Sequence, residues 1–244
     1  MILHGDVIEK IKEIETGTVQ CVVTSPPYWG LRDYGIDNQL GLEETPEEYV
    51  EKMVEVFREV KRVLRDDGTV WLNLGDSYIS QQTGSLGKYT GSESGFTKNH
   101  STQKQSLNRP NKKSKSLKSK DLVGIPFKTA FALQSDGWYL RQDIIWHKPN
   151  PMPESVTDRC TKSHEYIFLL TKSARYFYDA DAIKEPVTES SVGRLSQNIE
   201  KQIGTTRANA GQKSNGNLKA VGDIEKGRNK RSVWSINTQP YKEA

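Results

Sequence analysis

Residues 22–30 read VVTSPPYWG, an apolar run that is followed by two prolines and two aromatic residues. The run Val19–Thr24 is short, apolar and rich in β-branched residues, which predicts a buried strand at the centre of a sheet. Two prolines end it, and each fixes its own φ and has no N–H to donate. The first proline also keeps Ser25 extended. We therefore expect a stiff corner at the end of a central strand, with free carbonyl acceptors beside two aromatic rings.

Around this corner, strand and helix patterns alternate, which predicts an α/β fold with parallel strands and crossover helices. Thr45-Pro46 and a glutamate three residues after the threonine have the spacing of a helix N-terminus. Later in the chain, two β-rich runs favour an antiparallel pair at one edge of the sheet. The expected strands are 1–6, 19–24, 69–75, 139–148 and 165–172, and the expected helices are 7–14, 45–64 and 126–137.

The corner is also the candidate site, because ligands in open α/β sheets bind beyond the carboxyl ends of strands. Rigid acceptors beside an aromatic face suit a planar group with an amino substituent, such as a nucleobase. On these residues alone, a structural corner is an equal alternative. In that alternative the prolines only end the strand and the aromatics only seal the core.

Charge is unevenly spread along the 244 residues, whose formal net charge is +4. Residues 98–120 carry eight Lys or Arg and no acid, and residues 194–231 carry nine against three acids. The remainder of the chain is therefore strongly acidic. Basic loops on an acidic body indicate a polyanionic partner. The alternative is that the Lys-rich and Ser-rich loops are merely solvated.

Other classes of protein find little support in the composition. The two cysteines, Cys21 and Cys160, form neither a disulfide framework nor a metal-binding pair, and Cys21 is expected in the core. No metal site is expected. The chain has no apolar run of membrane-spanning length and no signal-peptide pattern at residues 1–10, so we expect a soluble cytoplasmic protein without a membrane partner.

The stretch VTSPPYW resembles the catalytic motif of amino-group DNA methyltransferases, (Asp/Asn/Ser)-Pro-Pro-aromatic. The Thr-Ser-Pro-Pro form is similar to the N4-cytosine branch, whereas Asp-Pro-Pro-Tyr is commoner in the N6-adenine branch. VLRDDGTVWLNLGDSY and the block from GWYLRQ to SARYFYD resemble the following strands of the same family. The resemblance covers residues 1 to about 185 and implies a circularly permuted, Rossmann-like, S-adenosylmethionine-dependent fold.

The resemblance also implies roles for the corner. The Ser25 side chain and the Pro26 carbonyl would accept the two amino hydrogens of a target base. Pro27 would stiffen the corner, and Tyr28 would stack on the base after it flips out of double-stranded DNA. The same comparison assigns Gly5 and Asp6 to S-adenosylmethionine, with helix capping as the alternative role of Asp6.

The DNA contacts expected from the sequence are more scattered. Lys148 and Arg159 are candidates for phosphate contacts, although a plain surface role is as plausible for both. Asp76 is expected either to line the cleft or to hold a turn. The pair His164-Glu165, at a strand start, is interpreted as structural rather than catalytic. The full set expected to bind DNA is Trp29, Lys112, Lys113, Lys148 and Arg159.

The chain departs from the family pattern in lacking the loop Asp-Pro-Phe-x-Gly-Ser-Gly-Thr, and no Gly-x-Gly occurs in it. We therefore expect an incomplete sheet of about five of seven strands. Truncation, a second subunit that supplies the rest, and a degenerate DNA binder are the open explanations. The expected organisation is a catalytic core (1–79 and 121–184), a mobile basic insertion (80–120) and a target-recognition segment with a truncated end (185–244).

The leading hypothesis is a DNA methyltransferase of a restriction–modification system that modifies cytosine N4. Adenine N6 is the alternative target, because both branches share the corner. A DNA-binding protein without catalysis is the alternative from another class. A methyltransferase for protein amides is disfavoured, since that class resembles this one at Asn-Pro-Pro-Tyr rather than at Ser25.

Overall fold

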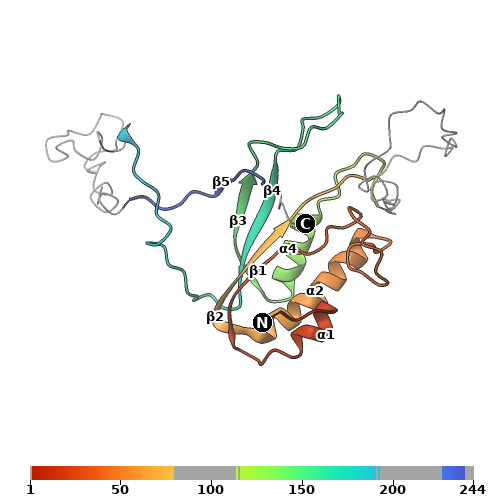
Figure 1. Ribbon diagram of the computed structural model, residues 1–244, viewed down its shortest axis with the longest axis horizontal. Helices are drawn as coiled ribbons and strands as arrows, with labels where there is room; N and C mark the ends of the chain where they lie inside the picture. Colours follow the sequence, from red (N-terminus) through yellow and green to blue (C-terminus); the bar gives the residue numbers. More distant parts are fainter. Residues whose placement is uncertain (1, 80–113, 115, 191, 193–226, 240–244) are drawn as a thin grey trace, which may run out of the picture. The chain divides into compact units, whose positions relative to one another are not determined.

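The computed structural model describes residues 2–79, 114, 116–190, 192 and 227–239 (Figure 1). The chain forms two compact units, Met1–Phe177 with Ser232–Ala244, and Tyr178–Arg231. The candidate site lies in the first unit. The elements are α1 (Val7–Ile11), β1 (Val19–Thr24), α2 (Pro46–Val63), β2 (Leu64–Leu74), α4 (Ile125–Ser135), β3 (Tyr139–His147), β4 (His164–Thr171) and β5 (Val233–Ser235).

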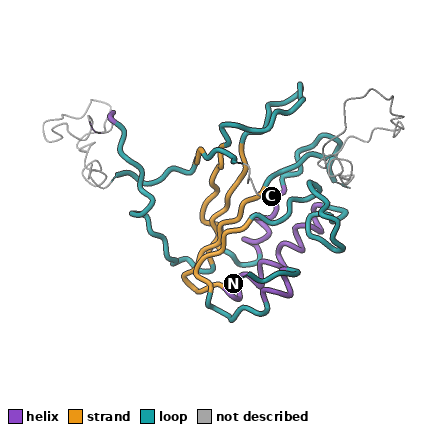
Figure 2. Tube along the Cα trace, in the orientation of Figure 1, coloured by secondary structure: helices purple, strands orange, loops and turns teal. Residues whose placement is uncertain are grey.

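Five strands form one mixed sheet in the order β1-β2-β4-β3-β5. β1 pairs with β2 in parallel, as does β3 with β5, whereas β4 is antiparallel to both of its neighbours. The helices gather on one side of the strands (Figure 2). The α/β class and the antiparallel β3–β4 pair are thereby confirmed, but the pair does not lie at the edge of the sheet, because β5 pairs with the outer side of β3. Because β4 runs the other way, its amino end lies at the same edge of the sheet as the carboxyl ends of β1, β2 and β3.

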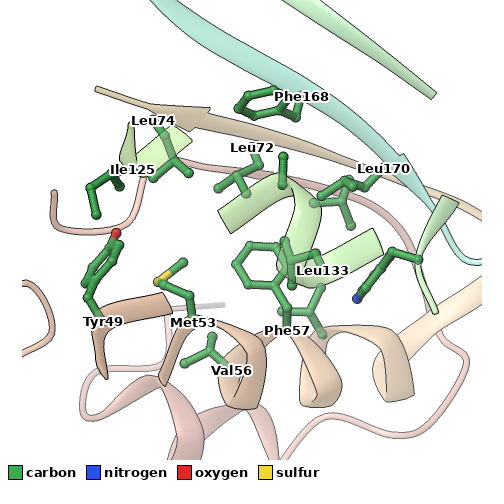
Figure 3. Close-up of a cluster of buried hydrophobic side chains, with 14 of the residues drawn as sticks. Tyr49, Met53, Val56, Phe57, Leu72, Leu74, Ile125, Leu133, Phe168 and Leu170 are labelled. Atoms are coloured by element: carbon green, nitrogen blue, oxygen red, sulfur yellow. The ribbon is translucent and has the colours of Figure 1, made fainter. Parts of the chain in front are cut away.

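Helix α2 provides the largest part of the core, and its sequence explains why. Thr45 Oγ1 accepts a hydrogen bond of 3.2 Å from the Glu48 amide, and Pro46 occupies the first turn. Apolar residues then recur every three or four positions and face the sheet and α4. Figure 3 shows this cluster, which includes Tyr49, Met53, Phe57, Leu72, Leu133 and Phe168, all at most 1% exposed.

The sheet corrects the expectation that β1 is central. Among the described residues no strand pairs with the other side of β1, so β1 is an edge strand. The expected core residue Cys21 is exposed, and Val23 on the same face is 79% exposed. Both side chains point to the face opposite the helices, since strand residues alternate between faces.

Two other strand predictions were wrong in detail. Residues 2–6 form no strand, and β2 begins at Leu64, so the Asp66–Gly68 segment lies inside the strand as an irregularity of the β1–β2 pairing. The fifth strand is β5, near residue 234.

In the second unit, the backbones of Glu185 and Arg228 exchange two hydrogen bonds. No helix in the described part of the chain combines the length and apolarity needed to span a membrane.

Candidate functional site

Polar side chains from three strands meet at the edge where β1, β2 and β3 end. Ser25 to Tyr28 follow β1 directly, Asn73 is the second-last residue of β2, and Glu165 is the second residue of β4. β2 lies between β1 and β4 in the sheet, which brings these positions together. The predicted corner is therefore one wall of a larger polar cluster.

The cluster is connected by short hydrogen bonds. Tyr28 Oη lies 2.7 Å from Asn73 Oδ1 and 2.9 Å from Glu165 Oε2. Ser25 Oγ lies 3.2 Å from both Tyr28 Oη and Asn73 Oδ1. Asn73 Nδ2 donates to the Tyr166 carbonyl at 3.1 Å, which turns the Asn73 amide oxygen toward the two hydroxyls. We call Ser25, Tyr28, Asn73 and Glu165 the edge cluster.

The two prolines of the corner differ in their contacts. The Pro27 carbonyl accepts a 3.0 Å hydrogen bond from the hydroxyl of Tyr49, which is fully buried in α2. For the Pro26 carbonyl, by contrast, the described residues supply no donor. The helix therefore fixes the corner through Pro27.

The ring of Tyr28 is held against the backbone of Gly75. A Cβ placed on Gly75 would lie 2.5 Å from Tyr28 Cε2, closer than real Cβ contacts allow. Gly75 is thus needed for the close approach of the ring rather than for its own backbone conformation. This contact and the hydroxyl's hydrogen bonds fix both ends of the Tyr28 side chain.

Glu165 and Lys148 form an ion pair beside the cluster, and their side chains are only 18% and 20% exposed. Burial opposes ionisation of Glu165, but hydrogen bonds from Lys148 and Tyr28 outweigh it and lower the pKa of the carboxyl. Burial, together with the charge of Glu165, raises the pKa of the Tyr28 phenol against the opposing effect of the Ser25 hydrogen bond. At neutral pH the edge therefore holds one anion, one cation and a neutral phenol.

The residues assigned to DNA contact from the sequence lie in other settings. Trp29 is 2% exposed and its indole N–H donates to the Glu43 carbonyl at 2.9 Å, a burial that does not match a DNA contact. Lys148 is bound to Glu165, and Arg159 is bound to Glu154 at 2.6 Å. Neither cation is therefore a free phosphate ligand. Lys112 and Lys113 lie outside the described residues.

On the side of the corner that faces α1 and α2 lies a cavity of about 540 Å³. Its walls are apolar except for Lys10, Thr24 and Ser25, and among the described residues no carboxylate lines it. Gly5 contributes to the wall. The carboxylate of Asp6 instead caps α1, accepting from the amides of Ile8 and Glu9 at 2.9 and 3.2 Å.

This cavity does not by itself fit S-adenosylmethionine. Its apolar walls suit a flat ring, but ribose hydroxyls and an amino-acid group need hydrogen-bond partners when they are buried. Asp76, the other acidic candidate, accepts hydrogen bonds from the amides of Ser77, Gly124 and Ile125 and so holds the start of α4. The polar half of a cofactor site is not built by the described residues.

Sequence reasoning missed Asn73, Gly75 and the role of Glu165 at this edge. A signal was present for Asn73, a polar residue in the otherwise apolar run VWLNL. For Glu165 the signal is weaker, because its partners Tyr28 and Lys148 come from two other segments and are joined only by the sheet order.

Comparison with known proteins identifies relatives of the whole described core. The family model described as DNA methylase, of the N6/N4 type, matches residues 19–244. The chain is 42% identical over 98% of its length to the type II methyltransferase M.Cfr9I of Citrobacter freundii and, with the same identity and coverage, to M.SmaI of Serratia marcescens. It spans about two thirds of these relatives, 65% and 68% of their lengths.

A solved structure is similar at a lower level. A putative DNA modification methylase from Thermus thermophilus, in complex with S-adenosyl-L-methionine, is 20% identical to this chain with a TM-score of 0.45. The match covers 79% of this chain and 62% of that protein.

Proposed function

The chain belongs to the N6/N4 DNA methylase family, and from this premise we propose that it methylates the exocyclic N4 of cytosine in double-stranded DNA. The target base would be flipped out of the duplex and held at the edge cluster. The family is S-adenosylmethionine-dependent, and that cofactor supplies an electrophilic methyl group when bound.

The chemistry asks for hydrogen-bond acceptors rather than for a nucleophile on the protein. The lone pair of an exocyclic amine is delocalised into the ring, so the nitrogen is a poor nucleophile. Acceptors that bind both amino hydrogens localise electron density on the nitrogen and fix its direction of attack. In our proposal Ser25 Oγ and the Pro26 carbonyl bind these hydrogens, and Tyr28 supports the face of the base.

One observation carries this proposal. The Pro26 carbonyl has no donor among the described residues, and it directly follows the exposed Ser25 hydroxyl at the carboxyl end of β1. The neighbouring carbonyl of Pro27 is already bound by Tyr49. Acceptors on two consecutive residues, beside an aromatic ring whose hydroxyl is hydrogen-bonded, support a site for an aromatic amine.

The preference for cytosine over adenine rests on Ser25. The Ser-Pro-Pro form of the corner resembles the N4-cytosine branch, and a neutral hydroxyl accepts less strongly than the carboxylate that is common in the N6-adenine branch. N6-adenine methylation is the alternative within the family. A role in a restriction–modification system, in the cytoplasm, agrees with the type II names of the relatives.

Product identification tests the proposal. The chain is incubated with double-stranded DNA and isotopically labelled S-adenosylmethionine, and the DNA is digested to nucleosides for mass spectrometry. We expect labelled N4-methyl-2′-deoxycytidine in the wild type and its loss in the Ser25→Ala variant. Labelled N6-methyl-2′-deoxyadenosine alone would contradict the cytosine assignment. The absence of any labelled nucleoside would contradict methyl transfer by this chain.

The apolar cavity favours a second candidate, DNA binding without catalysis. If the apolar walls of the described cavity are all that the chain offers to the methyl donor, the chain would transfer no methyl group. It would still bind DNA, with an affinity that falls steeply as the salt concentration rises. A binding assay at several salt concentrations, run with the nucleoside analysis, distinguishes the two candidates.

A further inference from the structure

We propose that Glu165, which is paired with Lys148, is a positioning residue. It directs the hydroxyl hydrogen of Ser25 toward Tyr28 and Asn73, so that the lone pairs of Ser25 Oγ face the target amine. The inference rests on the proposed function, because it concerns the same corner. It adds a residue from β4 whose effect on the base passes through Tyr28.

Counting donors and acceptors gives the direction of each bond. The ionised carboxylate of Glu165 can only accept, and the ammonium of Lys148 can only donate. The Asn73 amide nitrogen is used by the Tyr166 carbonyl at 3.1 Å, so its oxygen is also an acceptor for the cluster. Tyr28 and Ser25 each have one hydroxyl hydrogen to donate. The carboxylate of Glu165 and the amide oxygen of Asn73 are the acceptors for these hydrogens.

The choice made by Tyr28 decides the state of Ser25. Tyr28 Oη lies within hydrogen-bond distance of Glu165 at 2.9 Å, of Asn73 at 2.7 Å and of Ser25 at 3.2 Å. A hydrogen bond to an anion is stronger than one to a neutral oxygen, and so Tyr28 donates away from Ser25. The single hydrogen of Ser25 then points to the phenol oxygen or to the Asn73 oxygen, each 3.2 Å away, and the lone pairs of Ser25 stay free.

Without the anion this order is lost. A glutamine at 165 could turn its NH2 group to the phenol oxygen, and the hydrogen of Tyr28 would then be divided between the Asn73 oxygen at 2.7 Å and Ser25 at 3.2 Å. A bond from Tyr28 to Ser25 would occupy a lone pair that the target amine needs. The negative charge of Glu165 thus acts with the Asn73 oxygen to set the direction of the hydrogen bonds from Lys148 to Ser25.

Glu165 acts in this arrangement as a fixed anion and not as the final acceptor of the proton that the amine loses. Its carboxylate is paired with Lys148 on one side and receives Tyr28 on the other. Both partners stabilise the ionised form, and the lowered pKa of the carboxyl agrees with this.

The test compares Glu165→Gln with Glu154→Gln. Glu154 is a matched control, since it too is a partly exposed carboxylate bound to a cation, Arg159. We expect Glu165→Gln to lower kcat by about tenfold to a hundredfold, as for groups that orient a direct ligand. Its DNA affinity should stay near that of the wild type. Equal kcat in the two variants would overturn the proposal.

A second readout does not depend on methyl transfer. With 3-fluorotyrosine at position 28, a fluorine NMR titration of the whole chain reports the phenol pKa directly. Because the charge of Glu165 raises this pKa, Glu165→Gln should lower it and Glu154→Gln should leave it unchanged. An unchanged value in folded Glu165→Gln would overturn the proposal. A wild type without methyl transfer would contradict only the proposed function, and the titration would then still show whether the charge of Glu165 acts on Tyr28.

Discussion

The two sides of the corner at Ser25 are built in opposite ways. On the edge-cluster side, residues of β1, β2 and β4 are joined by hydrogen bonds of 2.7 to 3.2 Å. On the cavity side, residues of α1, β1 and α2 form apolar walls without a carboxylate among the described residues. The hydrogen-bonding groups on the edge-cluster side can hold an amine in one orientation. The cavity side has space for a ligand but few polar groups that would orient it. The side that we propose to hold the base is therefore built in more detail than the side that we propose to hold the methyl donor.

The largest effect should come from removing the acceptor on the cluster side. Ser25→Ala deletes the hydroxyl but no buried packing, so we expect kcat to fall by about a hundredfold to a thousandfold with the fold retained. Steady-state methylation with labelled cofactor measures it. Ser173→Ala, which removes a hydroxyl just beyond the opposite end of β4, is the control. Equal rates for the two variants would remove Ser25 from the site.

The packing of the Tyr28 ring against Gly75 should be the next most sensitive feature to mutation. Gly75→Ala places a methyl group 2.5 Å from the ring, so the ring must move, at a cost of about 1–3 kcal/mol in the free energy of unfolding. Activity should fall as well. Gly68→Ala is the matched control, because it crowds Leu64 at 2.6 Å far from the corner. It should lower stability but leave the activity of the folded protein intact, and equal activity losses would contradict a specific seat for Tyr28.

A smaller effect is expected at the link between α2 and the corner. Tyr49→Phe leaves the Pro27 carbonyl without its donor in a buried setting, which should lower the free energy of unfolding by about 1–2 kcal/mol. Urea denaturation followed by circular dichroism measures it. A variant as stable as the wild type would show that the hydrogen bond does not hold the corner.

The cavity side should tolerate change best. Val22→Ile adds a methylene group to the cavity wall, and we expect stability to change by less than about 1 kcal/mol. Val70→Ile adds the same group on the neighbouring strand at a site that is 0% exposed, where overpacking should cost about 1–3 kcal/mol. Similar losses in both variants would show that the cavity is closed in solution.

Local sequence signals predicted the parts of the fold that depend on neighbouring residues. The capping threonine and the apolar repeat located α2, and the β-branched run located β1 and the corner after it. The position of β1 in the sheet depends on which strands lie beside it, so its edge location and the exposure of Cys21 were not predictable from the run itself.

The candidate site shows the same division. Ser25 to Tyr28 are contiguous and were found from the motif, but Glu165 and Asn73 join them only through sheet order. The cations expected to bind phosphate, Lys148 and Arg159, have acidic partners whose contacts the sequence does not display. The basic segments that indicated a polyanionic partner lie largely outside the described residues, so their assignment to DNA remains a prediction.

The most direct test of the central claim is to find which residue touches the target base. Double-stranded DNA in which cytosines are replaced by 5-iodocytosine is irradiated with the chain, and the cross-linked peptide is identified by mass spectrometry. We expect an adduct on Tyr28 that disappears in Tyr28→Ala. Cross-links confined to other residues, with none on Tyr28, would contradict the claim that this corner holds a nucleobase.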